Sequence, residues 1–273
     1  MEPTIRLTSF LLVLVVMAIW ELLAPRGPLT VSKGLRWFSN LGIVAIDTAL
    51  LRLVLPVAAV GTAMVAEQRA WGLFNNVPVP YFFSIILSVA ILDFVIYLQH
   101  LMFHAVPRLW RVHMMHHTDF DLDVTSGLRF HPVEIVLSMC IKMAAVVLIG
   151  APPVAVVIFE ILLNATAMFN HGNVWVPLKL DALLRWVVVT PDMHRVHHSI
   201  ESRESNSNFG FNLPWWDRLL GTYRAQPAAG HEGMTIGLRQ FQSVRRQTLP
   251  WLLLVPFRGK PGDYAINRRK YGK

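Results

Sequence analysis

Histidines are the residues of this chain whose type and spacing could do chemistry, and there are 11 of them. Side chains three and four residues apart lie on one face of a helix, so closely spaced imidazoles can reach a common centre. Packing alone does not explain why one three-histidine pattern occurs twice. The spaced histidines form three motifs, His100-x3-His104, His113-x2-His116-His117 and His194-x2-His197-His198.

Two further histidines flank the apolar region at about 133–170. His131 comes just before this region and His171 comes just after it. A helical hairpin returns the chain to the side from which it started, so both rings are expected near the same membrane surface as the motifs. His231 stands in a glycine-rich stretch and is expected to be a surface residue.

Metal binding is the chemistry that this set predicts. Imidazole is a ligand for iron, copper, zinc and nickel. A structural zinc needs four ligands and a catalytic zinc three plus a water, so eight to ten histidines point to two metal ions sharing a site. The single cysteine, Cys140, excludes a thiolate set and an intramolecular disulfide. The residues alone do not choose between iron and zinc.

The composition indicates that lipid is part of the solvent. Of the 273 residues, 54% are hydrophobic and 15% charged, whereas about 25% charged residues are usual in soluble domains. A bilayer span takes roughly 20 mostly apolar residues. Leu7 to Trp20 could pass for a secretory signal, but no convincing cleavage site follows, and we expect a retained first helix. The expected spans are 5–24, 41–66, 80–103, 133–150 and 153–170.

The last two spans form a hairpin, because Gly150-Ala-Pro-Pro153 is a poor helix interior and a good turn. Basic residues in short loops set the orientation. They follow the first span, the third span and the hairpin, so these loops are expected on the cytoplasmic side and the N-terminus on the other. The basic residues are Arg26, Lys33, Arg36, Arg108, Arg111, Arg129, Lys179, Arg185 and Arg195.

Five charged residues lie in the interior of the expected spans, away from the span ends, where such residues usually face a protein interior. For four of them, mutual pairing within the bundle is the favoured interpretation. The fifth, Asp93, lies on the helix face of His100, so it either accepts the distal N–H of a ligand histidine or makes a structural contact. The four are Asp47, Arg52, Lys142 and Glu160.

The predicted fold is an all-α polytopic membrane bundle of about four spans plus or including a hairpin, under a cytosolic helical cap that carries a di-metal site. Residues 1–70 form N-terminal membrane helices, 71–225 the histidine-bearing domain and 226–273 a cytosolic or interfacial tail. Leu249 to Phe257 is apolar but too short to span. The formal net charge of +8 comes without basic runs interleaved with aromatics, which argues against nucleic acid.

The histidine motifs, together with Arg129-Phe-His131-Pro, Asn170-His171-Gly-Asn, Asn208-Phe-Gly-Phe and Trp216-Asp217-Arg, resemble those of the fatty acid hydroxylase/sterol desaturase superfamily over about 80–225. The resemblance implies a helical membrane bundle, a di-iron centre, and O2-dependent hydroxylation, desaturation or demethylation of a lipid. Electrons would come from a separate donor, since no cytochrome, dinucleotide or flavin motif is present. Asn170 and Asp217 would support the ligands or the scaffold. The implied metal ligands are His100, His104, His113, His116, His117, His131, His171, His194, His197 and His198.

Two other classes remain as alternatives. A histidine-rich metal transporter would place its ligands near the bilayer midplane, whereas these motifs lie at span ends. A zinc-dependent membrane hydrolase is disfavoured because the chain lacks His-Glu-x-x-His, and no glutamate is expected beside either three-histidine face as an obvious base. The expected setting is a bacterial inner membrane with the site facing the cytoplasm.

Overall fold

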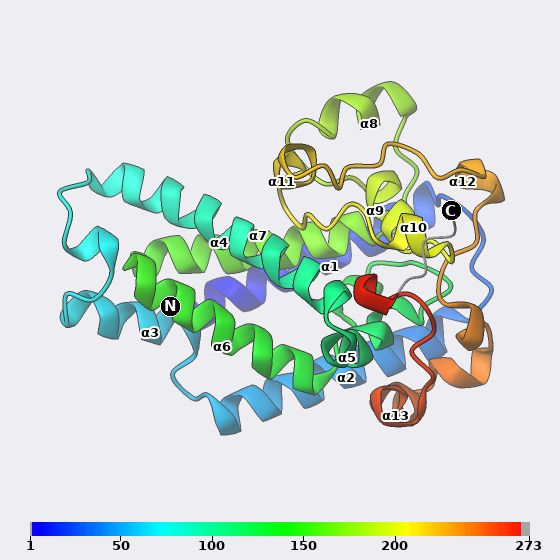
Figure 1. Ribbon diagram of the computed structural model, residues 1–273, viewed down its shortest axis with the longest axis horizontal. Coiled ribbons are helices and arrows are strands. Elements are labelled where there is room, and N and C mark those ends of the chain that lie inside the picture. The colour runs from blue at the N-terminus through cyan, green and yellow to red at the C-terminus, as the bar shows by residue number, and fades with distance from the viewer. Residues whose placement is uncertain (1, 269–273) are drawn as a thin grey trace.

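The computed structural model describes residues 2–268, and these residues form helices joined by loops, with two isolated β-bridges and no strand. Figure 1 shows long helices on the left and a cap of short helices and loops on the right. The long helices are α1 (Glu2–Leu23), α2 (Lys33–Val54), α3 (Ala58–Gln68), α4 (Tyr81–Ala105), α5 (Pro107–His117), α6 (Pro132–Ile149) and α7 (Pro153–Asn170). The cap helices are α8 (Leu178–Leu184), α9 (Pro191–His197), α10 (Ser202–Ser205), α11 (Trp215–Leu219), α12 (Gly230–Gly233) and α13 (Leu249–Arg258). Short 3-10 turns are η1 (Leu73–Asn75), η2 (Ser126–Leu128), η3 (Arg239–Phe241), η4 (Val244–Gln247) and η5 (Ile266–Arg268).

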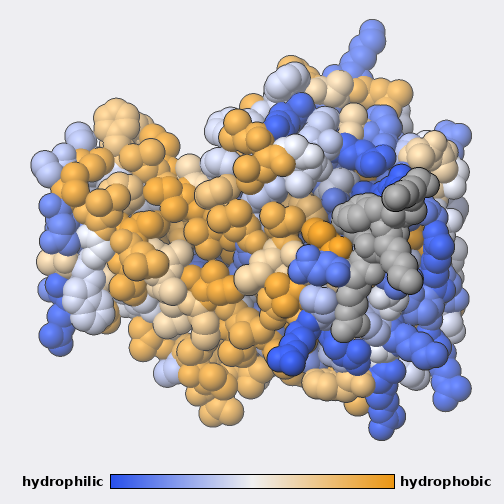
Figure 2. All heavy atoms as spheres, in the orientation of Figure 1, coloured by the Kyte–Doolittle hydropathy of each residue, from blue (hydrophilic) through white to orange (hydrophobic). Residues whose placement is uncertain are grey.

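Five helical segments are long and apolar enough to cross a membrane, which confirms a multi-pass membrane protein. They are α1, the stretch from α2 through η1, α4, α6 and α7. Apolar side chains cover this part of the surface in Figure 2, and polar residues gather at the cap. The spans match the predicted ranges, with one exception.

The second predicted span, 41–66, is wrong as a single helix. Helix α2 begins earlier, at Lys33, and ends at Val54, while α3 begins at Ala58. Pro56 lies in the break, where it lacks the N–H that a continuing helix needs, and Ala58 takes a left-handed φ of 49°. Helix α3 then packs on α6. Its buried face is made of Ala59, Ala63 and Ala66, whose small side chains allow a close approach.

The hairpin of α6 and α7 carries the chain away from the cap and back. Gly150 ends α6 in the left-handed conformation, with φ of 66°, and Pro153 begins α7. The prediction of two antiparallel spans with a turn at Gly150-Ala-Pro-Pro153 is therefore confirmed. Helix α7 packs against α1 and α4, so its C-terminal end reaches the cap beside the end of α4. The ends of α4 and α7, which are far apart in the sequence, therefore lie close together under the cap.

The C-terminal part folds back on the cap. Helix α13 packs against α5 and α2, and the cluster between them includes Trp110, Met114, Leu252 and Val255. The apolar stretch at 249–257, which is too short to span a bilayer, is thus part of the cap. The division at residues 70 and 225 stays a prediction.

Candidate metal centre

The structure brings nine of the ten predicted ligand histidines into two buried groups. Within each group, one ring nitrogen per residue lies within 4.8 Å of all the others. The groups adjoin, since the rings of His117 and His198 are 4.6 Å apart between centroids. The five-histidine group contains His100, His104, His113, His117 and His197, and the four-histidine group contains His116, His171, His194 and His198.

Each three-histidine motif contributes to both groups. On α5, His113 and His117 belong to the five-histidine group and His116 to the other. In the motif on α9, one histidine, His197, belongs to the five-histidine group, and the other two, His194 and His198, belong to the four-histidine group. Residues at i, i+3 and i+4 share one face but fan out around it, since each residue turns the helix by about 100°. One such motif can therefore supply ligands to two neighbouring centres.

Local sequence explains how these short helices begin. Pro107 opens α5 and Pro191 opens α9, and proline suits a first turn because that N–H has no helical partner. The hydroxyl of Thr190 accepts a hydrogen bond from the backbone N–H of Met193 at 3.3 Å, which caps α9. The third motif therefore lies on a helix whose start is capped by the residue just before it.

Oxygen acceptors fix the rings of most of these histidines through Nδ1. His100 Nδ1 donates to the backbone oxygen of Phe209 at 2.8 Å, and His197 Nδ1 donates to that of Ser207 at 2.8 Å. A carbonyl oxygen only accepts, so the proton must be on Nδ1 and the lone pair on Nε2. The backbone oxygens of Arg129 and Ala167 hold His116 and His171 in the same way, at 3.1 and 2.8 Å. This is the arrangement that orients metal-binding histidines.

The free Nε2 atoms then face one another. His100 Nε2 lies 3.1 Å from His113 Nε2, and His116 Nε2 lies 3.0 Å from His171 Nε2. Because these rings donate through Nδ1, the facing atoms each carry a lone pair and repel unless a cation lies between them. Two nitrogens at right angles around a metal ion, each at ~2.1 Å, are about 3 Å apart. The donor set and its spacing therefore fit bound metal ions.

Burial keeps five of these rings neutral, as metal binding requires. Burial disfavours the charged imidazolium and lowers the pKa of His171 to about 4 and that of His197 to about 3. The pKa values of His116, His194 and His198 also lie well below the usual range for the same reason. The field of the other histidines adds to the effect of burial in these three.

His131 lies outside both groups. It is the N-cap of α6, where its Nδ1 accepts a hydrogen bond from the backbone N–H of Val133 at 3.2 Å. Its Nε2 lies 3.2 Å from the backbone oxygen of Leu253 on α13. Both ring nitrogens are thus engaged in holding a helix start and the C-terminal helix. His231 also lies outside the groups, but the expectation of a surface residue is wrong, because its side chain is 8% exposed and its Nε2 lies 4.0 Å from Asp192 Oδ2.

Sequence reasoning missed Glu134, in the first turn of α6. Its Oε1 accepts a hydrogen bond from His113 Nδ1 at 2.7 Å, and the side chain is 3% exposed. The expectation that no glutamate stands beside a three-histidine face is therefore wrong. The available signal was its place three residues after His131, facing the same end of the bundle. This carboxylate orients His113 and strengthens it as a ligand.

Asp93 does not support a ligand histidine. It accepts hydrogen bonds from Trp216 Nε1 at 2.8 Å and from the backbone N–H groups of Asn212 and Leu213 at 3.4 and 3.3 Å. It therefore fastens the cap to α4, which is the structural alternative. The pairing predicted for interior charges holds for Lys142 and Glu160, 2.8 Å apart.

Asp217 and Asn170 hold the loop at 209–211 over the site. Asp217 accepts from the backbone N–H groups of Phe209 and Gly210, both at 2.8 Å, and Asn170 donates to the backbone oxygen of Phe211 at 3.1 Å. The oxygen of Phe209 in turn orients His100. Asp217 therefore holds the scaffold of the cap, and through Phe209 it also reaches a histidine of the site.

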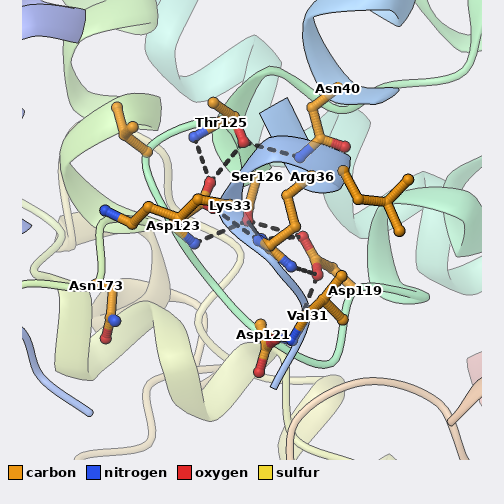
Figure 3. A network of polar contacts seen from close by, with 12 residues as sticks. Val31, Lys33, Arg36, Asn40, Asp119, Asp121, Asp123, Thr125, Ser126 and Asn173 are labelled. Atoms are coloured by element: carbon orange, nitrogen blue, oxygen red, sulfur yellow. Dashed lines mark hydrogen bonds and ion pairs between the residues drawn. The ribbon is translucent and has the colours of Figure 1, made fainter. Parts of the chain in front are cut away.

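A buried ion cluster fixes the loop between α5 and α6 (Figure 3). Arg36 on α2 donates to both carboxylate oxygens of Asp119 at 2.6 and 2.9 Å and to Asp123 at 2.7 Å. Burial alone would raise the pKa of Asp119, but Arg36 and Arg129 lower it below its usual value. Ser126 joins the cluster through a hydrogen bond from Arg36 at 2.9 Å. The loop carries Arg129, whose backbone oxygen holds His116.

A cavity of about 300 Å3 extends from the five-histidine group into the bundle. His100, His113 and Glu134 line one end of it. Ile96, Phe103, Leu163 and Phe211 contribute apolar wall. The site therefore combines two groups of neutral imidazoles with an apolar chamber at the depth of the spans.

The comparisons with known proteins agree with this arrangement. The family model for "Fatty acid hydroxylase" matches residues 85–222. Ornithine lipid hydroxylase of Rhizobium tropici is 32% identical over 151 residues, which cover 54% of this chain and 44% of the relative. Alkylglycerol monooxygenase of Xenopus tropicalis is 25% identical over 213 residues, 76% of this chain and 46% of the relative. Cholesterol 25-hydroxylase of Rattus norvegicus is 22% identical over 146 residues, 52% and 47% of the two chains.

The chain spans less than half the length of these curated relatives. No solved structure matches it. The matched residues include all nine histidines of the two groups and cover half of the chain. The protein is therefore a member of the fatty acid hydroxylase family.

Proposed function

We propose that the chain is a membrane-bound di-iron oxygenase that hydroxylates or desaturates a lipid with O2 and electrons from a separate donor. The observation that carries the proposal is the pair of adjoining histidine groups at the end of an apolar cavity. Relatives named as lipid hydroxylases and monooxygenases support it. Imidazole suits iron but also zinc and copper, so the metal is part of the proposal.

The nine grouped histidines would hold the metal ions, and a di-iron centre would supply reductive O2 activation and removal of hydrogen from a C–H bond. The protein's own contribution is positional. Backbone oxygens of Phe209, Arg129 and Ala167 keep three imidazole lone pairs aimed inward. Glu134 does the same for His113. The apolar walls bind the lipid next to the centre and exclude water from it.

The placement of the groups bears on the alternatives. A transporter holds its ligands near the bilayer midplane, whereas His104, His117 and His198 here stand at the ends of α4, α5 and α9. A zinc hydrolase would need a general base beside the metal, whereas Glu134 serves to orient His113 through one of its oxygens. Both classes become outcomes of the experiment below.

The experiment pairs metal analysis with a product assay. Protein purified from its native membrane should contain about two iron ions per chain and should form an oxidised lipid only when O2 and a reductant are supplied. Mass spectrometry after 18O2 exposure identifies a hydroxylated product by incorporated label and a desaturated one by loss of two hydrogens. Zinc in place of iron, with turnover undiminished under strict anoxia, would reject the oxygenase.

We also propose a bacterial inner membrane with the cap in the cytoplasm. The basic residues Arg26, Lys33 and Arg36 precede or begin α2 at the cap end, as the positive-inside rule favours. The test replaces the exposed Cys140 by alanine and introduces a cysteine at the exposed Glu232. In intact spheroplasts this thiol should resist a membrane-impermeant maleimide and react after lysis. Labelling before lysis would reverse the orientation.

A further inference from the structure

The cavity contains a carboxylate that the protein itself does not satisfy. Asp47 lies on α2, lines the cavity and is 6% exposed. Its Oδ1 has no hydrogen-bond partner, and Asp47 forms no ion pair with any residue in the described range 2–268. The prediction that Asp47 pairs within the bundle is therefore wrong, and the same holds for Arg52, which is exposed on α2.

An unsatisfied buried carboxylate is costly, because burial removes its bonds to water without replacing them. Other charges on the same cavity show the contrast. Lys142 and Arg6 contact the two oxygens of Glu160 at 2.8 and 2.9 Å, so this cluster is paired internally. It needs no ligand to balance it. Asp47 has no such arrangement.

Two more acceptors on the cavity are also unsatisfied. Glu134 uses Oε1 for His113, but its Oε2 has no partner. Gln99 donates to Ser138 at 2.8 Å, while its Oε1 accepts nothing. Asp47 and Glu134 are close enough to interact electrostatically. The unmet demand of this chamber is thus for hydrogen-bond donors, and one of its members, Glu134, also contacts His113.

We infer that the cavity recognises a lipid bearing a hydrogen-bond-donating group, an amine or a hydroxyl, which Asp47 and Glu134 hold next to the carbon to be oxidised. The inference rests on the proposed function, because it names the substrate class of that site. Asp47 acts as a specificity residue. The apolar walls bind the adjoining chain, and the acceptors fix which carbon approaches the five-histidine group.

The size and the opening of the cavity agree with partial entry of a lipid. About 300 Å3 is at the lower end for a ligand site, so only the part of the lipid near the reacting carbon fits. Thr48 on α2 and Asn164 on α7 both line the cavity and are exposed. The chamber therefore opens on the surface of the spanning helices, and the rest of the molecule stays in the bilayer.

The test measures binding in nanodiscs by displacement of a fluorescent lipid from the metal-loaded protein. The probes are an aminoacyl lipid with a free amine, its N-acetylated counterpart, a 1-O-alkylglycerol and its di-O-methyl ether. The wild type should bind the better of the two donor lipids about ten- to a hundredfold more tightly than its blocked counterpart, the range of a hydrogen bond to a charged group. Asp47→Leu should abolish that preference. Asp47→Asn distinguishes the two kinds of donor lipid, since loss of the carboxylate should weaken binding of the amine lipid more than binding of the hydroxyl lipid.

Controls separate recognition from damage. Thr48→Val changes a neighbouring polar side chain on the same cavity and should keep the preference. Asp47→Leu should not lower the thermal unfolding midpoint, because no internal bond is lost, whereas a structural role would lower it. Equal binding of free and blocked lipids by the wild type, or a preference that survives Asp47→Leu, would overturn the inference.

Turnover in the same nanodiscs distinguishes the two proposals. Donor preference without an O2-dependent product would reject the oxygenase and leave the recognition by Asp47 standing. An oxidised product formed equally from free and blocked lipids would reject the recognition and leave the oxygenase standing.

Discussion

Gly127 lies directly against the backbone oxygen of Ala167, so closely that a Cβ on Gly127 would be 2.2 Å from that oxygen. The same oxygen accepts the hydrogen bond from His171 Nδ1 at 2.8 Å. The loop after α5 and the last turn of α7 therefore meet at the atom that orients a histidine of the four-histidine group. A larger residue at Gly127 would therefore disturb the position of His171, although Gly127 itself is no metal ligand.

Replacing Gly127 by alanine should displace the end of α7 and loosen the four-histidine group. Overpacking of this kind typically costs about 1–3 kcal/mol. We expect a lower thermal midpoint and loss of roughly half of the bound metal, measured by inductively coupled plasma mass spectrometry. Gly233→Ala is the matched control, since the nearest atom to its added Cβ is 3.6 Å away. Full metal content in Gly127→Ala would contradict the expectation.

The histidines themselves allow a sharper comparison. His116→Ala and His197→Ala each remove a ligand from one group, so metal content and turnover should both fall by tenfold or more while membrane insertion is unchanged. His131→Ala should retain its metal, because both of its ring nitrogens are engaged outside the groups. Metal loss in His131→Ala equal to that in His116→Ala would show that His131 is a ligand.

Glu134→Gln tests the carboxylate behind His113. The loss of such a partner typically lowers metal affinity or activity by about 10- to 100-fold. We expect this decrease in a chelator competition titration at neutral pH. Glu232→Gln, at an exposed position, provides the control. Unchanged metal affinity in Glu134→Gln would indicate that the contact with His113 carries no energetic weight.

The Arg36 cluster should dominate the stability of the loop between α5 and α6. Arg36→Met leaves the buried Asp119 and Asp123 without their main partner, and breaking such a pair costs about 3–5 kcal/mol. The control is Arg239→Met, whose pair with Glu201 is exposed and contributes about 0–1 kcal/mol. Thermal unfolding in detergent, followed by tryptophan fluorescence, measures both. A similar decrease of the unfolding midpoint in Arg36→Met and Arg239→Met would contradict a special role for the Arg36 cluster.

Acid should destabilise the metal-free protein. The pKa values of His171 and His197 are about 4 and about 3 in the folded chain and about 6.5 when unfolded. Between these limits the unfolded chain binds protons that the folded chain excludes, so stability is lost as the pH falls from about 6.5. Each group contributes on the order of 1.4 kcal/mol per pH unit. Unfolding midpoints from pH 8 to pH 4 should decline, and less steeply in the double variant H171A/H197A. A flat profile for the parent would refute this.

Local geometry explains what was predictable. Helical spacing identified eight of the nine grouped histidines, because an i, i+3, i+4 pattern fixes a shared face without any knowledge of tertiary structure. The ninth, His171, was predicted from its place directly after the helical hairpin. The hairpin at Gly150 was predictable for the same reason, since two prolines and a glycine act within a few residues. Each of these signals is contained in one short stretch of chain.

The remaining features depend on contacts between distant segments. Asp93 shares a face with His100 but precedes it by two helical turns, about 11 Å, and it meets Trp216 from the cap instead. His131 faces away because its Nδ1 caps α6, which competes with ligation. Glu134 reaches His113 only because α5 and α6 pack together, and the partner of Arg36 lies 83 residues away along the chain.

The histidine groups draw on α4, α5, the end of α7 and α9, so ligands from the spans and from the cap converge on the same two centres. Bound metal would act as a staple between parts of the molecule that otherwise meet through loops and side-chain contacts. Protein made under iron limitation would then lack this staple, and the supply of metal would set how long each copy escapes proteolysis as well as whether it turns over substrate.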